Sequence, residues 1–114
     1  MSQITTHVLD TARGLPAANI AIELSQLGPD GQWLRLAQGM TNEDGRITNL
    51  LNHSQPLSAG IYRMHFALED YFANQKQAVF YPWAEVVFKL DANGAHYHIP
   101  LLLSPYGYST YRGS

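Results

Sequence analysis

The chain has 114 residues, no cysteine and a formal net charge of -2 at pH 7. These values favour one domain that can bury its own core, and they exclude disulfides and thiolate chemistry. Arginine and lysine are scattered along the chain rather than clustered, so we expect no nucleic-acid partner.

The first ten residues, MSQITTHVLD, lack the basic residue and the apolar run of roughly 7–15 residues that a secretory signal requires. No stretch of the sequence approaches the ~18 apolar residues of a membrane-spanning helix. We therefore expect a protein that works in the cytoplasm and has no membrane partner.

Short apolar segments alternate with turn sequences along most of the chain. The sequences GPDGQ (28–32), NEDGR (42–46) and DANGA (91–95) each contain Asp-Gly or Asn-Gly, which tolerate the positive φ of tight hairpin turns. This pattern is typical of a hairpin-rich all-β domain. The predicted strands cover residues 4–10, 18–27, 33–41, 45–49, 60–67, 84–91, 95–104 and 107–112.

One segment departs from the strand pattern. Residues 68–77, LEDYFANQKQ, have acidic residues at the start and no β-branched residue, which favours about two turns of helix. Two packed sheets would give each half-apolar sheet a surface to bury. The sequence therefore predicts a single all-β domain over residues 1–114, a two-sheet sandwich of about eight strands with one short helix.

Side-chain alternation sorts the strand residues by face. In HYHIPLLLS (96–104), the better core set is Tyr97, Ile99, Leu101 and Leu103, whereas His96 and His98 point the other way. In residues 4–10, Thr6 and Val8 share one face, and Thr5, His7 and Leu9 share the other. If the last two strands pair, one outer face carries His98, Ser109 and Tyr111 together.

These residues admit more than one interpretation. His96 and His98 lie two apart on a strand and could reach one metal ion, but no third ligand follows nearby, so we expect no metal. The alternative is two histidines on a half-exposed strand. His7 alone can be a polar outer-face residue, and Arg46 alone can be a solvated turn residue.

Three stretches carry a resemblance to a known family: HVLDTARGLPA (7–17), TNEDGR (41–46) and HYHIPLLLSPYGYSTYRGS (96–114). With them, the chain resembles the 5-hydroxyisourate hydrolases, the transthyretin-like enzymes of purine degradation. Its end, Tyr111-Arg112-Gly113-Ser114, is similar to the C-terminal tetrapeptide that distinguishes these enzymes from hormone-carrying transthyretins.

The resemblance implies a transthyretin-like sandwich that assembles as a homotetramer, a dimer of dimers with sites at the dimer–dimer interface. It implies hydrolysis of 5-hydroxyisourate at the N1–C6 bond without a cofactor or metal. The catalytic residues carried over are His7, Arg46 and His98, and the pocket residues are Tyr111, Arg112, Gly113 and Ser114. The alternative is a transthyretin-like carrier of small ligands without catalytic activity.

The resemblance also implies roles for these groups. One histidine, His98 in preference to His7, would act as general base on water, and the other would hold the ring or protonate the leaving nitrogen. Arg46 would hold substrate oxygens. Tyr111 would close the pocket, and Ser114 would contribute its hydroxyl or the terminal carboxylate to orienting hydrogen bonds.

Overall fold

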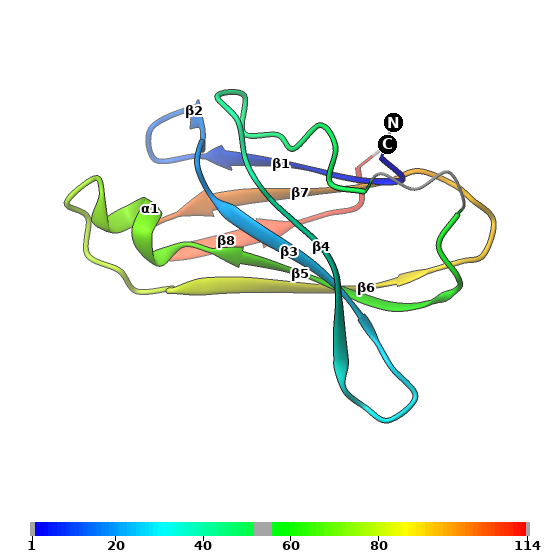
Figure 1. Cartoon of the computed structure of the whole chain (residues 1–114). Helices are drawn as coiled ribbons and strands as arrows, with labels where there is room; N and C mark the ends of the chain where they lie inside the picture. Colours follow the sequence, from blue (N-terminus) through cyan, green and yellow to red (C-terminus); the bar gives the residue numbers. More distant parts are fainter. Residues whose placement is uncertain (1, 52–55, 114) are drawn as a thin grey trace.

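The computed structural model describes residues 2–51 and 56–113, and within these ranges it contains eight β-strands and one short α-helix (Figure 1). The helix is α1 (Glu69–Ala73). The strands are β1 (Ile4–Asp10), β2 (Leu15–Pro16), β3 (Ala21–Leu27), β4 (Trp33–Met40), β5 (Gly60–Ala67), β6 (Trp83–Leu90), β7 (Tyr97–Ser104) and β8 (Gly107–Thr110).

The strands form two four-stranded sheets, with the orders β2-β1-β7-β8 and β4-β3-β5-β6. β1 and β7 pair in parallel, whereas every other pair of neighbouring strands is antiparallel. The sheets face one another, and α1 lies at one end of the sandwich (Figure 1). The predicted all-β two-sheet sandwich is confirmed.

The core lies between the sheets and follows the alternation seen in the sequence. On β7, the predicted core residues Tyr97, Ile99, Leu101 and Leu103 are all at most 5% exposed. On β1, Thr6 and Val8 are buried, while Thr5 and His7 are only half-buried. The side chains that meet them from the second sheet include Ile22, Leu24, Met64 and Phe66. The predicted division between inner and outer faces is confirmed.

The predicted strand at 45–49 is wrong. Only Arg46 pairs there, through an isolated bridge to His7. Ile47, Leu50 and Leu51 are buried in the core instead. Their spacing of three and one does not alternate between two faces as a strand requires, so this segment covers the core as a loop.

The short strand β2 was not predicted. It contains only Leu15 and Pro16, which pair with Asp10 and Leu9 at the edge of the sheet. Two residues ending in proline give no alternation to detect, and an edge position accommodates a residue without a backbone N–H.

Other boundaries are shorter than predicted. β3 begins at Ala21 rather than residue 18, since Asn19 has a positive φ of 64°. β8 ends at Thr110 rather than residue 112. The helix has five residues rather than two full turns, and the chain leaves it through Lys76, whose φ is 56°.

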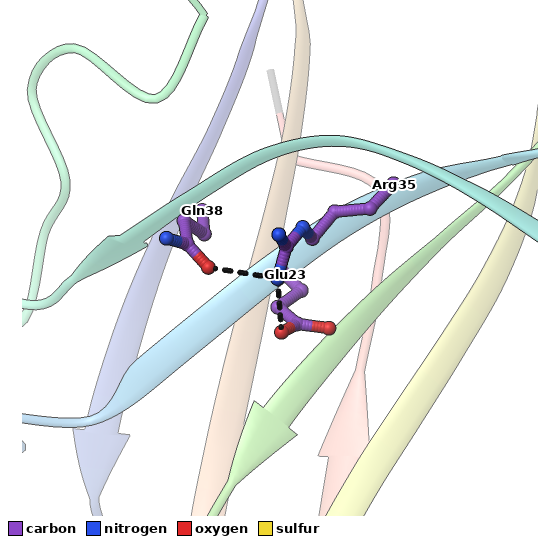
Figure 2. A network of polar contacts seen from close by, with 3 residues as sticks. All are labelled: Glu23, Arg35 and Gln38. Carbon is purple, nitrogen blue, oxygen red and sulfur yellow. Dashed lines mark hydrogen bonds and ion pairs between the residues drawn. The ribbon is translucent and has the colours of Figure 1, made fainter.

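The β3–β4 hairpin carries a polar network on its exposed surface (Figure 2). The guanidinium Nη1 of Arg35 donates to Glu23 Oε1 at 3.3 Å and to Gln38 Oε1 at 3.1 Å. Because the Arg35 and Glu23 side chains are largely solvated, such a pair stabilises the hairpin by only about 0–1 kcal/mol.

Candidate active site

Two strands of the first sheet bring histidines to the face that points away from the core. Thr5 of β1 lies opposite His98 of β7, and His7 lies opposite Pro100. Because side chains two apart share a face, Thr5, His7 and His98 point to the same side of the sheet. The fold therefore places the two histidines that the resemblance assigned to the site on one face of this sheet.

The turn at residues 42–46 brings Arg46 to the same face. The Asn42 side-chain Oδ1 accepts from the backbone N–H of Asp44 at 2.9 Å and of Arg46 at 3.0 Å. The carbonyl of Gly45 then accepts from the backbone N–H of Val8 at 2.8 Å, which fixes the turn against β1. In this position the backbone of Arg46 pairs with that of His7 as an isolated antiparallel β-bridge.

A surface cavity of about 450 Å³ opens beside these groups. This volume is within the roughly 300–1,000 Å³ of small-molecule sites. Arg46, His96 and His98 line it together with Thr5, Thr6, Ile47 and Thr48. His7 does not line the cavity; it lies next to it, since its backbone pairs with that of Arg46, which does line it.

His98 is held from two sides. Its Nδ1 lies 2.9 Å from Thr5 Oγ1, and its backbone carbonyl accepts from the N–H of Gly113 at 2.8 Å. A Cβ added to Gly113 would lie 2.5 Å from the Cδ2 of the His98 ring. Gly113 is therefore required for the close approach of the C-terminal segment to this imidazole.

The environment favours the neutral form of both histidines. Burial lowers the pKa of His98, and the positive charge of Arg46 lowers it further, followed by His96 and His7. Burial and then Arg46 also lower the pKa of His7, against a smaller opposing effect of Asp44. A neutral imidazole can accept a proton, so both groups are suited to act as bases near neutral pH.

Arg46 keeps its charge available for a ligand. Among residues 2–51 and 56–113, the ion pairs join Arg35 to Glu23 and Arg63 to Glu85. No carboxylate in that part of the chain therefore neutralises Arg46. A guanidinium beside a cavity offers two parallel donors to a planar oxygen or carboxylate group.

The comparisons with known proteins show the family of the chain. The family model described as HIUase/Transthyretin family matches residues 4–113. The chain belongs to the HIUase/Transthyretin family. It is 48% identical to the 5-hydroxyisourate hydrolase of Mus musculus, with 99% of this chain and 96% of the relative covered.

A bacterial member of the HIUase/Transthyretin family is similarly close. The 5-hydroxyisourate hydrolase of Halalkalibacterium halodurans is 42% identical, and the match covers 98% of each chain. Among solved structures, sea bream transthyretin in complex with thyroxine superposes with a TM-score of 0.91 at 38% identity. That match covers 98% of this chain and 95% of the transthyretin chain. The transthyretin-like fold is therefore confirmed.

The C-terminal segment divides between two parts of the surface. Gly113 contacts His98, whereas the guanidinium of Arg112 lies 4.6 Å from the centre of the Tyr97 ring on the inner side of the sheet. Tyr111 and Arg112 line a second cavity, of about 240 Å³, beside β6. Within one chain they do not line the histidine cavity, so their part in the substrate site stays a prediction. Ser114 lies outside the described residues.

Two polar residues of the cavity were not predicted to have a role. Thr5 was assigned only to an outer face, and His96 was considered as a metal ligand or as an ordinary histidine of a half-exposed strand. The Oγ1 of Thr5 lies 2.8 Å from His96 Nε2 as well as 2.9 Å from His98 Nδ1. The missing information was the parallel register of β1 and β7, because local alternation does not say which residues of two strands lie opposite each other.

Two further observations concern metal ligands and membrane-spanning helices. Within the described ranges, no three of the His, Asp and Glu side chains gather as metal ligands would. In the same part of the chain, no helix is long and apolar enough to cross a membrane.

Proposed function

We propose that this chain hydrolyses 5-hydroxyisourate, opening the six-membered ring at the N1–C6 bond. The product is 2-oxo-4-hydroxy-4-carboxy-5-ureidoimidazoline, an intermediate between urate and allantoin. The observation that carries the proposal is the grouping of His7, His98 and Arg46 beside one cavity. Relatives at 48% and 42% identity that are named 5-hydroxyisourate hydrolase support the same activity.

His98 is the general base of the proposed reaction. Its Nδ1 is engaged by Thr5, so Nε2 is the nitrogen left to accept a proton from water. Burial and Arg46 lower the pKa of His98 and favour the neutral form that can do so. General-base assistance of this kind contributes about 10²–10⁴-fold to a rate.

The proton and electron balance follows from this assignment. The oxygen of the deprotonated water attacks C6, and the electron pair of the C6 carbonyl moves to its oxygen. When that pair returns, the C6–N1 bond breaks, and N1 takes the proton that His98 accepted. His7, whose pKa is lowered by burial and by Arg46, holds the ring as a neutral hydrogen-bonding group.

Arg46 stabilises the charge that develops on the C6 oxygen. Its guanidinium remains charged at any working pH and has no carboxylate partner in the described part of the chain. Donors held in place before the reaction stabilise such an oxyanion without further reorganisation. The turn at residues 42–46 fixes the backbone from which this guanidinium extends, because Asn42 Oδ1 accepts from the backbone N–H groups of Asp44 and Arg46.

The remaining predictions for the site concern assembly. We propose a cytoplasmic homotetramer, a dimer of dimers in which Tyr111, Arg112, Gly113 and Ser114 complete sites at the dimer–dimer interface. The 57% exposure of the Tyr111 side chain in a single chain supports a contact with another subunit. Light scattering should give four times the chain mass of 12.7 kDa; a monomer would contradict the assembly.

The direct test of the activity uses substrate made in place. Urate oxidase converts urate to 5-hydroxyisourate, whose ultraviolet absorbance then decays. We expect this chain to accelerate the decay strongly over the spontaneous rate. An unchanged rate would contradict the proposed activity.

A carrier without catalytic activity is the second candidate, because sea bream transthyretin was solved with thyroxine and shares the fold. Calorimetry with thyroxine distinguishes the two. Tight thyroxine binding without hydrolysis would favour the carrier. Hydrolysis without such binding would favour the enzyme.

A further inference from the structure

One hydroxyl joins two of the imidazoles at the cavity. Thr5 Oγ1 lies 2.8 Å from His96 Nε2 and 2.9 Å from His98 Nδ1, both within hydrogen-bond distance. The two rings lie nearly parallel, with an interplanar angle of 22° and centroids 6.4 Å apart. The proposed mechanism uses only His98 of these two histidines; it notes that Thr5 engages Nδ1 of His98, but it does not say which of the two groups donates, and it assigns nothing to His96.

The number of protons limits how the three groups can bond. A threonine hydroxyl has one hydrogen and two acceptor lone pairs, so it donates to at most one of the two ring nitrogens and accepts an N–H from the other. If Thr5 donates to His98 Nδ1, then His96 must supply an N–H from Nε2. If Thr5 donates to His96 Nε2, then His98 must supply an N–H from Nδ1.

Of these two arrangements, only the second makes His98 a base. A neutral imidazole carries one N–H, and the hydrogen bond made by one nitrogen determines which nitrogen keeps the proton. With the proton on Nδ1, the lone pair of Nε2 is free for a proton from water. With the proton on Nε2, the same nitrogen can donate but cannot accept.

We infer that Thr5 is a positioning residue that relays a hydrogen bond from His98 Nδ1–H to His96 Nε2, and that it thereby keeps the lone pair of His98 Nε2 available. The inference rests on the proposed function, in which His98 is the general base. The relay also fits the protonated state, because an imidazolium at His98 still donates from Nδ1 to Thr5. Proton transfer at Nε2 therefore requires no rearrangement of the three groups.

Two substitutions at Thr5 distinguish the effect of its hydroxyl from the effect of its side-chain shape. Thr5→Val keeps the branched side chain and removes the hydroxyl, whereas Thr5→Ser keeps the hydroxyl. Thr11→Val is the matched control, because Thr11 Oγ1 donates to the backbone carbonyl of Leu103 and, within the described ranges, forms no hydrogen bond with a histidine. His96→Leu removes the acceptor at the other end of the relay.

The first measurement needs no substrate. Nitrogen NMR of histidine-labelled, assembled protein at pH 7.5 reports which ring nitrogen of His98 carries the proton. We expect Nδ1–H in the wild type, Thr5→Ser and Thr11→Val, and loss of that preference in Thr5→Val and His96→Leu. A wild-type His98 with its proton on Nε2, or an unchanged tautomer in Thr5→Val, would overturn the relay.

The second measurement separates kcat from KM for 5-hydroxyisourate. We expect kcat of Thr5→Val to fall about tenfold, a part of the ~10²–10⁴-fold general-base contribution. KM should stay unchanged, and Thr5→Ser should retain most of the wild-type kcat. A tautomer change without a fall in kcat would overturn the catalytic role of the relay, as would an equal fall in Thr5→Ser.

The two measurements test the proposed function and the hydrogen-bond relay independently. A wild-type protein that leaves 5-hydroxyisourate untouched contradicts the proposed function and the catalytic role of Thr5 with it. The NMR spectrum of the free protein still supports or contradicts the hydrogen-bond relay in that case.

Discussion

Gly113 is the residue at which the C-terminal segment meets His98. A methyl group at this position would lie 2.5 Å from Cδ2 of the imidazole, so the ring would have to turn. We expect Gly113→Ala to lower kcat about tenfold or more, since small displacements of a reacting group are costly. The melting temperature should change little, because the contact lies on the outer face of the sheet.

Gly107→Ala is the matched control for this substitution. A Cβ at Gly107 has Ser104 Oγ at 3.7 Å as its nearest neighbour, which is ordinary van der Waals contact. Its kcat should equal the wild-type value. Equal activity of Gly113→Ala and Gly107→Ala would contradict the role given to the close approach at His98.

The charge of Arg46 should be visible in the pH dependence of the reaction. Arg46 lowers the pKa of His98, so removing its charge should raise that pKa and move the acid limb of kcat/KM to higher pH. Arg46→Gln tests this, and Arg35→Gln on the β3–β4 hairpin is the control. An acid limb that stays in place, or moves to lower pH, would show that Arg46 does not act on the essential base.

At the scale of elements, the turn at residues 42–46 contributes to the stability of the fold and also positions the backbone of Arg46. Gly45 has a φ of 73°, and a Cβ there would collide with the backbone carbonyl of Val8. We expect Gly45→Ala to lower the free energy of unfolding by about 1–3 kcal/mol and to reduce kcat/KM. Urea unfolding and steady-state kinetics measure the two effects.

Gly31→Ala supplies the comparison for the turn. Gly31 also has a positive φ, of 80°, but an added Cβ meets nothing within 4 Å. This variant should lose some stability through its backbone conformation and keep its activity. If Gly45→Ala kept full activity as well, the turn would not be what positions Arg46.

The sequence predicts elements well where the signal is local. Alternation in residues 96–104 identified the buried face of β7, and the Asp-Gly pair in residues 28–32 marked the β3–β4 hairpin, because both signals depend only on neighbouring residues. Residues 91–95 instead connect β6 of one sheet to β7 of the other, and residues 42–46 lead into a loop, so the other two turns do not form hairpins. The segment at 45–49 was mispredicted because Ile47 and Leu50 are apolar for a tertiary reason: they cover the core as a loop. The Thr5 contacts depend on the register of two strands 91–93 residues apart in sequence, which no local pattern contains.

At the scale of the whole molecule, the site should weaken the fold in acid. The pKa values of His7 and His98 are lower in the folded chain than the unfolded value of about 6.5. The unfolded chain therefore binds more protons at these residues as the pH falls below that value. By linkage, the free energy of unfolding decreases with falling pH in this range.

The double variant His7→Gln/His98→Gln should reduce this decrease of the free energy of unfolding at acid pH. Unfolding between about pH 7.5 and 5.5 at one fixed protein concentration measures the change. His65→Gln is the control, since His65 lies on β5 of the other sheet, stacked on Trp83. A double variant with the wild-type pH dependence would contradict the lowered pKa values.

The central claim is that this chain hydrolyses 5-hydroxyisourate with His98 as its base. The most direct measurement is the decay rate of freshly made 5-hydroxyisourate with the wild type, His98→Gln and His65→Gln side by side. We predict strong acceleration by the wild type and His65→Gln, and at least a ~10²-fold lower kcat in His98→Gln. A wild type that leaves the spontaneous decay unchanged, or a His98→Gln variant with the kcat of the wild type, would contradict the account.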